Sequence, residues 1–379
     1  MRIAQIAPIW ERVPPYGYGG TELVVSLLTE ELVRRGHEVT LFAAGDAQTS
    51  ANLISGYPVS FRETNFPKPV FRQVQNKMIS QAFAHSLDFD VIHSHVGTRG
   101  IWHSLASQVP VIHTLHGPVL PTLSTPLLKG LRENPVKALK PRARSLWRRL
   151  VWPRIPNQFF VSISDSQRHP DLKIAYISTV YNAVDYQSFT FYEAPEEPVY
   201  LAFLGRLSPE KGTHHAIMIS RESGIPLRIA GKVDPVDRTY FKEVIEPQID
   251  GVHIQYLGEA NHSQKNALMG GAIATLFPIT WSEPFGLVMI ESMASGTPVI
   301  ALEKGSTREV IADGKTGFLC QTVEECVAAV ARVGSLNRQD CREHVAQRFG
   351  VGRMTDDYEA VYRQAIAAFS GRKAELARD

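Results

Sequence analysis

Residues 272–302 read AIATLFPITWSEPFGLVMIESMASGTPVIAL, and this stretch indicates how the chain folds. It begins with a short apolar run, AIATLFP, and ends with a second one, TPVIAL. Between them a loop carries Glu283, and Phe285 and Gly286 then open a segment of helical composition. A strand, a loop, a helix and a second strand in this order are typical of a parallel βαβ unit.

Apolar runs of strand length recur along the whole chain. The first set is RIAQIAP, VTLFAA, DVIHSH, PVIHTL and QFFVSIS, and the second is VYLAFLG, PLRIAG, VHIQYLG, AIATLFP and TPVIAL. These runs alternate with amphipathic stretches, which is the rhythm of parallel sheets covered by helices on both faces. Residues 181–198 separate the two sets and are rich in turn formers, acids and prolines, so they are predicted to connect two domains.

We therefore expect an α/β protein with two Rossmann-like, doubly wound domains that face a cleft. The predicted domains are residues 1–182 and 183–352. After Gly352, apolar and aromatic side chains recur at helical spacing, so a helix at about 353–371 should bury one face. In open α/β sheets ligands bind beyond the carboxyl ends of the strands, so the residues just after each strand are the candidate site residues.

The composition excludes several other classes of protein. The chain has 379 residues, of which 44% are hydrophobic and 21% charged, enough for two ordinary domains. No apolar run approaches the ~20 residues of a membrane-spanning helix, and the start lacks the features of a secretory signal, so we expect a cytoplasmic protein. Three cysteines without paired spacing favour neither a disulfide framework nor a zinc site, and no nucleic-acid partner is expected.

One segment departs from the balanced charge of the chain. The net charge is +2, but residues 129–154 hold nine basic residues and only one acid, Glu133. A solvated helical face fits this pattern, and so does a surface for anionic lipid or for an anionic acceptor. The second interpretation would place the protein at the periphery of a membrane, and both interpretations stay open.

A glycine-rich loop, GYGGTE at residues 17–22, follows the first strand after a short connection. Gly19 and Gly20 would let backbone amides approach a phosphate, and Thr21 is placed to cap a helix that runs to about Arg35. A dinucleotide fingerprint is an alternative, but the spacing GxGG does not match GxGxxG. A tight turn without a ligand is the other alternative.

The first strand of the second half ends in GRLSPEKG, residues 205–212. Ser208 can cap the next helix and Pro209 can take its first position, which would bring Lys211 into the first turn while Arg206 stays on the loop. Two cations and a helix start suit a diphosphate, which Arg grips with a planar fork and Lys as a point charge. An ordinary basic surface loop is the alternative.

The loop and helix after AIATLFP carry two acids, Glu283 and Glu291, about two turns apart. Carboxylates suit polyol ligands because each can accept hydrogen bonds from two adjacent hydroxyls. The amides of Phe285, Gly286 and Leu287 could bind further hydroxyls or a phosphate. In the alternative interpretation Glu291 is an exposed helix residue with no ligand.

Other polar pairs fit structural roles better. Asp88 and Asp90 form a D-x-D, but they precede the strand VIHSH and fit a turn, so no metal role is expected. His93 and His95 should lie on one face of that strand, where zinc would need a third ligand that is absent nearby in sequence. His214 and His215 are expected at the surface.

Together these motifs resemble those of family 4 glycosyltransferases across nearly the whole chain. The matching pieces are GYGGTE with RGHEVTLFAA, HTLHG, YNAVD, GRLSPEKG and EPFGLVMIESMASGTPVIA, in the order and at the spacing typical of that family. The resemblance implies the GT-B fold, in which residues 1–182 bind the acceptor and residues 183–352 bind a sugar nucleotide. It also implies that the last helix, at about 353–371, packs back on the first domain.

The resemblance further implies roles for single residues. Glu283 would contact hydroxyls of the donor sugar, Glu291 the ribose, and Arg206 with Lys211 the diphosphate. The reaction would retain the anomeric configuration and use no metal ion or other cofactor. UDP-glucose or a close relative is the first expected donor and GDP-mannose the second, whereas the acceptor is unknown.

By the same resemblance, Gly19 and Gly20 would contact the diphosphate from the opposite domain, and His116 would lie beside the sugar and its reacting carbon. We thus expect catalytic roles for His116, Glu283, Arg206 and Lys211. Donor-binding roles are expected for Gly19, Gly20, Arg206, Lys211, Glu283, Phe285, Gly286, Leu287 and Glu291.

The sequence bears on the mechanism in one respect. A double displacement would need a carboxylate nucleophile, and the loops of the first domain offer no obvious acid for that role. In the alternative, the departing diphosphate, held by Arg206 and Lys211, accepts the proton of the acceptor. His116 would then position and polarise, or act as a general base.

Two other functions fit the same architecture. A sugar-nucleotide epimerase or a phosphorylase could use it, because a fold does not fix a reaction. A non-catalytic sugar-nucleotide-binding protein is the third hypothesis, and His116 argues against it, since a pure binder has little need of a residue beside the reacting carbon. Product analysis separates the enzymes, because an epimerase needs no acceptor.

Overall fold

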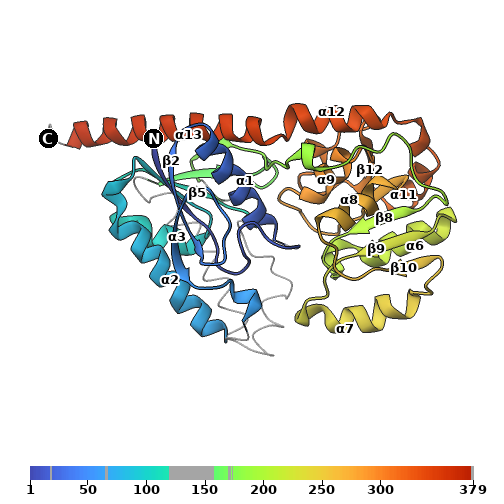
Figure 1. Ribbon diagram of the computed structural model, residues 1–379. Coiled ribbons are helices and arrows are strands. Elements are labelled where there is room, and N and C mark those ends of the chain that lie inside the picture. Colours follow the sequence, from blue (N-terminus) through green and yellow to red (C-terminus); the bar gives the residue numbers. More distant parts are fainter. Residues whose placement is uncertain (18, 65–66, 119–157, 170–171, 173, 377–379) are drawn as a thin grey trace. The chain divides into compact units, whose positions relative to one another are not determined.

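Figure 1 shows the computed structural model, which describes residues 1–376 apart from 18, 65–66, 119–157, 170–171 and 173. The chain divides into two compact units. Unit 1 comprises Met1–Val13, Thr29–Val180 and Asp356–Asp379, and unit 2 comprises Pro14–Leu28 and Tyr181–Thr355. The basic segment 129–154 lies outside the described residues, so its role at an anionic surface stays a prediction.

Unit 1 contains a seven-stranded, fully parallel sheet with the order β3-β2-β1-β4-β5-β6-β7. Its strands are β1 (Arg2–Ile6), β2 (Glu38–Ala44), β3 (Asn52–Tyr57), β4 (Val91–Ser94), β5 (Val111–Thr114), β6 (Gln158–Ser162) and β7 (Tyr176–Thr179). The helices α1 (Gly20–Arg34), α2 (Lys68–Ala84) and α3 (Thr98–His103) follow β1, β3 and β4. The strand order reverses between β1 and β4, as in a doubly wound fold.

The two faces of this sheet carry different side chains. Side chains alternate along a strand, so Ala4 and Ile6 of β1 share one face and Gln5 points to the other. Ala4 and Ile6 belong to an apolar cluster with Met78 of α2. Gln5 instead bonds Tyr362 of α13 (Val351–Leu376). The second face is therefore polar where α13 packs on it.

Unit 2 contains a six-stranded parallel sheet with the order β10-β9-β8-β11-β12-β13. Its strands are β8 (Leu201–Leu204), β9 (Leu227–Ala230), β10 (Ile254–Tyr256), β11 (Ala274–Phe277), β12 (Val299–Leu302) and β13 (Gly317–Cys320). Its helices are α6 (Thr213–Ser223), α7 (Arg238–Tyr240), α8 (His262–Gly270), α9 (Leu287–Ala294), α10 (Thr307–Val310), α11 (Val323–Val330) and α12 (Arg338–Arg348). The order reverses between β8 and β11, so the loops after these two strands flank a switch point.

Helices cover both faces of the unit 2 sheet. α6 and α11 pack on each other and on β8, β9, β12 and β13, whereas α9 packs on α8, α12, β11 and β12. Right-handed crossovers in opposite directions from the switch point place α6 and α9 on opposite faces of the sheet. The sheet is apolar as a result: Leu201, Ile229, Leu276 and Ile300 are fully buried in one cluster.

The fold class predicted from the sequence, two Rossmann-like doubly wound sheets, is confirmed, and each strand-like run contains a strand. The sequence pattern did not indicate β3, β7 or β13, each of which lies at an edge of its sheet. The C-terminal helix is longer than expected, and its stripe is buried at Met354, Tyr358, Val361, Tyr362, Ala365 and Phe369. Within the described parts of the chain, no helix combines the length and the apolar character that crossing a bilayer requires.

Two helix starts differ from the expectation. α1 begins at Gly20, so Thr21 lies in its first turn and not at the capping position before it. α9 begins at Leu287, and Gly286 before it has a φ of 82°. Left-handed backbone does not fit inside a right-handed helix, so Phe285 and Gly286 precede this helix and do not open it.

Candidate functional site

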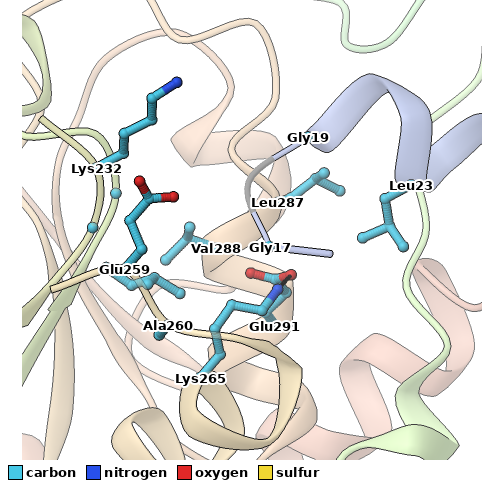
Figure 2. A pocket seen from close by; sticks show the side chains of 14 residues that line it. Gly17, Gly19, Leu23, Lys232, Glu259, Ala260, Lys265, Leu287, Val288 and Glu291 are labelled. Atoms are coloured by element: carbon cyan, nitrogen blue, oxygen red, sulfur yellow. Dashed lines mark hydrogen bonds and ion pairs between the residues drawn. The ribbon is translucent and has the colours of Figure 1, made fainter. Parts of the chain in front are cut away.

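A pocket in unit 2 lies at the carboxyl ends of β8, β9 and β10 and beside the start of α9 (Figure 2). Its lining residues are Gly17, Gly19, Gly20, Leu23, Leu204, Gly205, Gly231, Lys232, Glu259, Ala260, Lys265, Leu287, Val288 and Glu291. This place beside the switch point is where open α/β sheets bind ligands.

Four charged side chains line this pocket, namely Lys232, Glu259, Lys265 and Glu291. Figure 2 shows Lys265 of α8 reaching the carboxylate of Glu291 on α9, where Nζ and Oε1 lie 2.5 Å apart. The Glu291 side chain is only 5% exposed, which excludes the interpretation of it as an exposed helix residue. A carboxylate in a pocket wall can accept hydrogen bonds from adjacent ligand hydroxyls.

The first turn of α9 contributes Leu287 and Val288 to the pocket. The first amides of a helix have no partner within it, and the helix dipole favours an anion there. Of the residues predicted to bind a donor, Gly19, Gly20, Leu287 and Glu291 line this pocket. The other predicted residues of unit 2, Arg206, Lys211, Glu283, Phe285 and Gly286, are not among its lining residues.

A second group of predicted residues joins the loops after β8 and β11. Nζ of Lys211 contacts Oε2 of Glu283, and Nε1 of Trp281 donates a hydrogen bond of 3.0 Å to the same oxygen. Nζ of Lys211 also lies 5.2 Å from the centre of the Trp281 ring, within range of a cation–π contact. The structure thus brings together two residues that the sequence assigned separately to the diphosphate and to the sugar.

Close backbone contacts hold these two loops together. The amide of Thr280 donates to the carbonyl of Glu210 at 2.9 Å. Gly212 has a φ of 73°, and a Cβ there would lie 1.9 Å from the carbonyl oxygen of Pro278, so only glycine fits. This glycine also separates a 3₁₀ turn, Pro209–Lys211, from α6, and Ser208 makes no side-chain capping bond, so the predicted cap is wrong.

The loop that carries Glu283 is fixed from its other side. The amide of Ser306 donates to the Glu283 carbonyl at 3.0 Å, and Oγ of Ser306 donates to the Phe285 carbonyl at 2.6 Å. A Cβ on Gly305, whose φ is 59°, would lie 2.3 Å from the Glu283 carbonyl oxygen. The Phe285 side chain is buried, so only its backbone could contact a ligand.

Arg206 lies among acids that the sequence did not predict. Its guanidinium contacts Glu210 and lies 3.5 Å from Asp234 and 3.7 Å from Asp237. Burial raises the pKa of Asp234, but the hydrogen bond and charge of Lys232 together with Arg206 outweigh this and lower it. These carboxylates orient Arg206, and a diphosphate would have to compete with them for its N–H groups.

His116, in unit 1, follows β5 and is partly exposed. Its Nε2 lies 2.8 Å from Nδ1 of His95, with the two rings stacked. Burial lowers the pKa of His116 from 6.5 to about 4, so the ring is neutral near pH 7. Its predicted place beside a donor sugar stays a prediction.

The other polar pairs have structural partners. Asp90, just before β4, accepts hydrogen bonds from the amide and Nη2 of Arg2 at 2.8 and 2.9 Å, which joins it to the start of β1. His93 and His95 share one face of their strand, as predicted, with rings 4.0 Å apart. His214 is half-buried and bonds Oη of Tyr240 at 2.8 Å.

The three cysteines, Cys320, Cys326 and Cys341, are buried free thiols. Among the described residues, no three or more His, Cys, Asp or Glu side chains are arranged to hold a metal ion.

Besides the acids around Arg206, sequence reasoning missed the polar and aromatic side chains of Lys232, Glu259, Lys265 and Trp281. Lys232 and Glu259 follow β9 and β10, so the rule of inspecting the residues after each strand points to them. Trp281 is two residues from Glu283 in the same loop. Lys265 lies inside α8, and no motif around it indicates its contact with Glu291.

Comparisons with known proteins agree with this architecture. The family model Glycosyltransferase Family 4 matches residues 18–188, and the model for glycosyl transferases group 1 matches residues 187–348. A phosphatidyl-myo-inositol mannosyltransferase of Mycobacterium leprae is 26% identical over 411 aligned residues, which cover 100% of both chains.

Two solved structures share the fold at lower identity. Sucrose-phosphate synthase of Thermosynechococcus elongatus superposes with a TM-score of 0.74 at 20% identity, covering 97% of this chain and 100% of the other. HepE of Anabaena in complex with UDP-glucose superposes with a TM-score of 0.68 at 17% identity, covering 96% and 100%. Because the two family models together span residues 18–348 and the paired parallel sheets match GT-B enzymes, the chain belongs to the family 4 glycosyltransferases.

Proposed function

We propose that the protein transfers a hexose from a nucleoside-diphosphate sugar to a hydroxyl acceptor, with retention of the anomeric configuration and without a metal ion. The observation that carries this proposal is the unit 2 pocket, in which Glu291, the first turn of α9, Gly19 and Gly20 converge. Glu291 offers a buried carboxylate for ribose hydroxyls, and the backbone amides of the helix start and of the glycines suit a diphosphate.

UDP-glucose is the first proposed donor and GDP-mannose the second. HepE of Anabaena binds UDP-glucose within the same fold, and the Mycobacterium leprae relative is a mannosyltransferase. We place the donor in the half of the chain at residues 183–352 and the acceptor in the half at residues 1–182. The acceptor of the mannosyltransferase is phosphatidyl-myo-inositol, and the basic residues of 129–154 would suit an acceptor with a similar anionic phosphate.

In the proposed reaction the bond between the anomeric carbon and the diphosphate breaks as the acceptor hydroxyl attacks from the same face. The acceptor proton passes to the departing phosphate oxygen, so no separate base is required. Lys211 and Arg206 stabilise the negative charge that develops on the diphosphate. We expect donor binding to exchange the ion pair of Lys211 with Glu283 for contacts of Lys211 with phosphate and of Glu283 with sugar hydroxyls.

The donor can be tested by thermal denaturation against a panel of sugar nucleotides. A ligand at a hundred times its dissociation constant stabilises the folded state by ~2.7 kcal/mol, which is readily measured. The Glu291→Gln variant is the control, and it should respond less to the same ligand. If no sugar nucleotide raises the melting temperature of the wild-type chain, the proposal is wrong.

The reaction is tested by incubating the stabilising donor with candidate hydroxyl acceptors and following the anomeric proton by NMR. Retention predicts that the product has the same anomeric configuration as the donor. Release of a changed sugar nucleotide in the absence of any acceptor would instead indicate an epimerase.

A further inference from the structure

A buried chain of hydrogen bonds in unit 1 ends at His116. Oη of Tyr362, on α13, lies 3.1 Å from Nε2 of Gln5 and 2.8 Å from Nδ1 of His93. Oε1 of Gln5 lies 2.8 Å from Nε2 of His95. Nδ1 of His95 in turn lies 2.8 Å from Nε2 of His116. Four segments of the polypeptide, around residues 5, 93–95, 116 and 362, thus meet through side-chain hydrogen bonds.

The interior of this hydrogen-bond chain is shielded from water. Gln5, His93 and Tyr362 are fully buried, and His95 is 4% exposed. A polar atom in such a place has to find its partner within the protein, because leaving it unpaired is costly. The donors and acceptors along the chain are therefore matched as a set and not one at a time.

The side-chain amide of Gln5 determines which atom donates in each hydrogen bond of this hydrogen-bond chain. Its nitrogen donates to Tyr362, so its oxygen accepts a hydrogen bond from Nε2 of His95. A neutral imidazole carries one proton, so His95 with its proton on Nε2 presents Nδ1 as an acceptor. Only a proton on Nε2 of His116 can satisfy that acceptor. Nδ1 of His116 is then the unprotonated nitrogen.

Burial keeps these rings neutral. It lowers the pKa of His95 well below 6.5, and nearby His93 and His116 lower it further. Burial also lowers the pKa of His116 to about 4. At neutral pH each ring thus has one donor and one acceptor nitrogen, as the directional argument requires.

The other branch of the hydrogen-bond chain, through Tyr362 and His93, is consistent with these donors and acceptors. Tyr362, which accepts from Gln5, can donate its own proton to Nδ1 of His93. Nε2 of His93 then carries the proton and donates to Oγ1 of Thr114 at 2.7 Å. Oγ1 of Thr114 also lies 3.0 Å from Oη of Tyr358, which gives the hydroxyl proton of Thr114 an acceptor.

We propose that Gln5 and His95 are positioning residues that hold His116 in the tautomer with its proton on Nε2, so that its Nδ1 accepts a hydrogen bond from a substrate hydroxyl. This inference rests on the proposed function, because it specifies how His116 would act beside the reacting sugar. An acceptor nitrogen orients a hydroxyl through its proton and can polarise the O–H bond, which a donor N–H cannot do. The reversed amide of Gln5 would give the opposite tautomer of both histidines.

The tautomer can be measured directly in the full-length wild-type chain labelled with ¹⁵N-histidine. Long-range proton–nitrogen correlation NMR at neutral pH distinguishes protonated from unprotonated ring nitrogens, and a His116→Gln variant identifies the signals of His116. We expect a protonated Nε2 and an unprotonated Nδ1. A proton on Nδ1 would overturn the proposal, whether or not a donor and an acceptor have been found.

The positioning role is tested kinetically with a matched pair of variants. Gln5→Met removes the acceptor of His95, and we expect kcat to fall about tenfold, the scale of one lost hydrogen bond, with little change in KM. Gln158→Met is the control, because Gln158 of β6 also bonds a buried histidine, His113 of β5, and no hydrogen bond within the described residues connects this pair to His116. It should lower the melting temperature and leave kcat unchanged.

A further pair of variants tests whether the acceptor atom of His95 matters. His95→Asn keeps an amide oxygen that can accept from Nε2 of His116, whereas His95→Phe keeps only a ring. We expect His95→Asn to retain most of kcat and His95→Phe to lose it. Equal activity of these two variants, or a normal kcat for folded Gln5→Met, would show that the hydrogen-bond chain has only a structural role.

Discussion

Nζ of Lys265 lies 2.5 Å from Oε1 of Glu291, and the two side chains are only 13% and 5% exposed. The pair joins α8 to α9 in the wall of the unit 2 pocket. A carboxylate can accept about four hydrogen bonds, so the contact with Lys265 leaves capacity for ligand hydroxyls. Lys265 thus orients the residue that we assign to the ribose.

Glu291→Gln should weaken binding of the sugar nucleotide while preserving the shape of the side chain. The amide is a poorer acceptor than the carboxylate, and hydrogen bonds to charged groups contribute ~1.5–3 kcal/mol. Donor affinity should fall at least several-fold. Calorimetric titration with the donor measures this, and unchanged affinity would contradict the assignment of Glu291 to the ribose.

Lys265→Met should destabilise the fold more than Lys265→Met combined with Glu291→Gln. Removing one partner of a buried ion pair leaves an uncompensated charge, which costs ~3–5 kcal/mol, whereas neutral replacement of both partners is often tolerated. Urea unfolding of the two single variants and the double variant measures the coupling energy. Additive losses in free energy of unfolding would show that the contact has little energetic weight.

Acid should destabilise unit 1 through histidines that are neutral in the folded state. Burial lowers the pKa of His113 and of His116 from 6.5 to about 4. Between pH 6.5 and about pH 4 the unfolded chain binds protons that the folded chain does not, so the free energy of unfolding falls as the pH falls. The loss is ~1.4 kcal/mol per pH unit for each such histidine, and stability is fully present only above about pH 6.5.

Urea unfolding at pH 7 and at pH 5 measures this dependence. His113→Asn should remove the contribution of one histidine and so reduce the difference between the two pH values. Equal free energies of unfolding at pH 7 and pH 5 in the wild-type chain would contradict the prediction.

The central strands could be predicted from the sequence, but three edge strands could not. β8 (LAFL) reads as a continuous apolar run because helices cover both of its faces, and β1 (RIAQI) is apolar apart from Arg2 and Gln5. β3 (NLISGY) and β7 (YIST) contain no fully buried residue, and β13 (GFLC) has only four residues. An edge strand pairs on one side only, so it can fold with fewer apolar residues and its sequence resembles that of a loop.

The candidate site was predictable where one motif holds the residues, as for Lys211 in GRLSPEKG and Glu283 in the EPFG loop. Contacts between distant segments left no local signal. Lys265 is 26 residues from Glu291, and Gln5 is 90 residues from His95 and 357 from Tyr362. Only the packed sheets and helices bring these side chains together.

The basic segment 129–154 should bind anionic membranes in a salt-dependent manner. Each basic residue near such a surface contributes ~1 kcal/mol at low ionic strength, and salt screens the attraction. Sedimentation with vesicles of anionic lipid at low salt should recover the protein, and high salt should release it. Equal and negligible recovery with neutral and anionic vesicles would remove the membrane interpretation and leave a solvated face or a soluble anionic acceptor.

Glycosyl transfer should be independent of divalent metal ions. A departing diphosphate develops negative charge that must be stabilised more strongly in the transition state than in the bound donor. Arg206, Lys211 and the amides at the start of α9 can supply this stabilisation. Activity should therefore survive exhaustive chelation, and a loss that magnesium or manganese restores would contradict the mechanism.

Lys211→Ala should lower turnover by about a hundredfold or more, which is the scale of losing one charge contact in a transition state. Nζ of Lys211 contacts Glu283 and faces the Trp281 ring, so the substitution also frees Glu283 from its cation. Lys211→Arg should restore little, because the planar guanidinium fork does not fit where a point charge is held. Trp281→Phe is the matched control: it removes the hydrogen bond to Glu283 but keeps the cation and the ring, so turnover should fall much less. Normal turnover of Lys211→Ala would show that another group holds the leaving diphosphate.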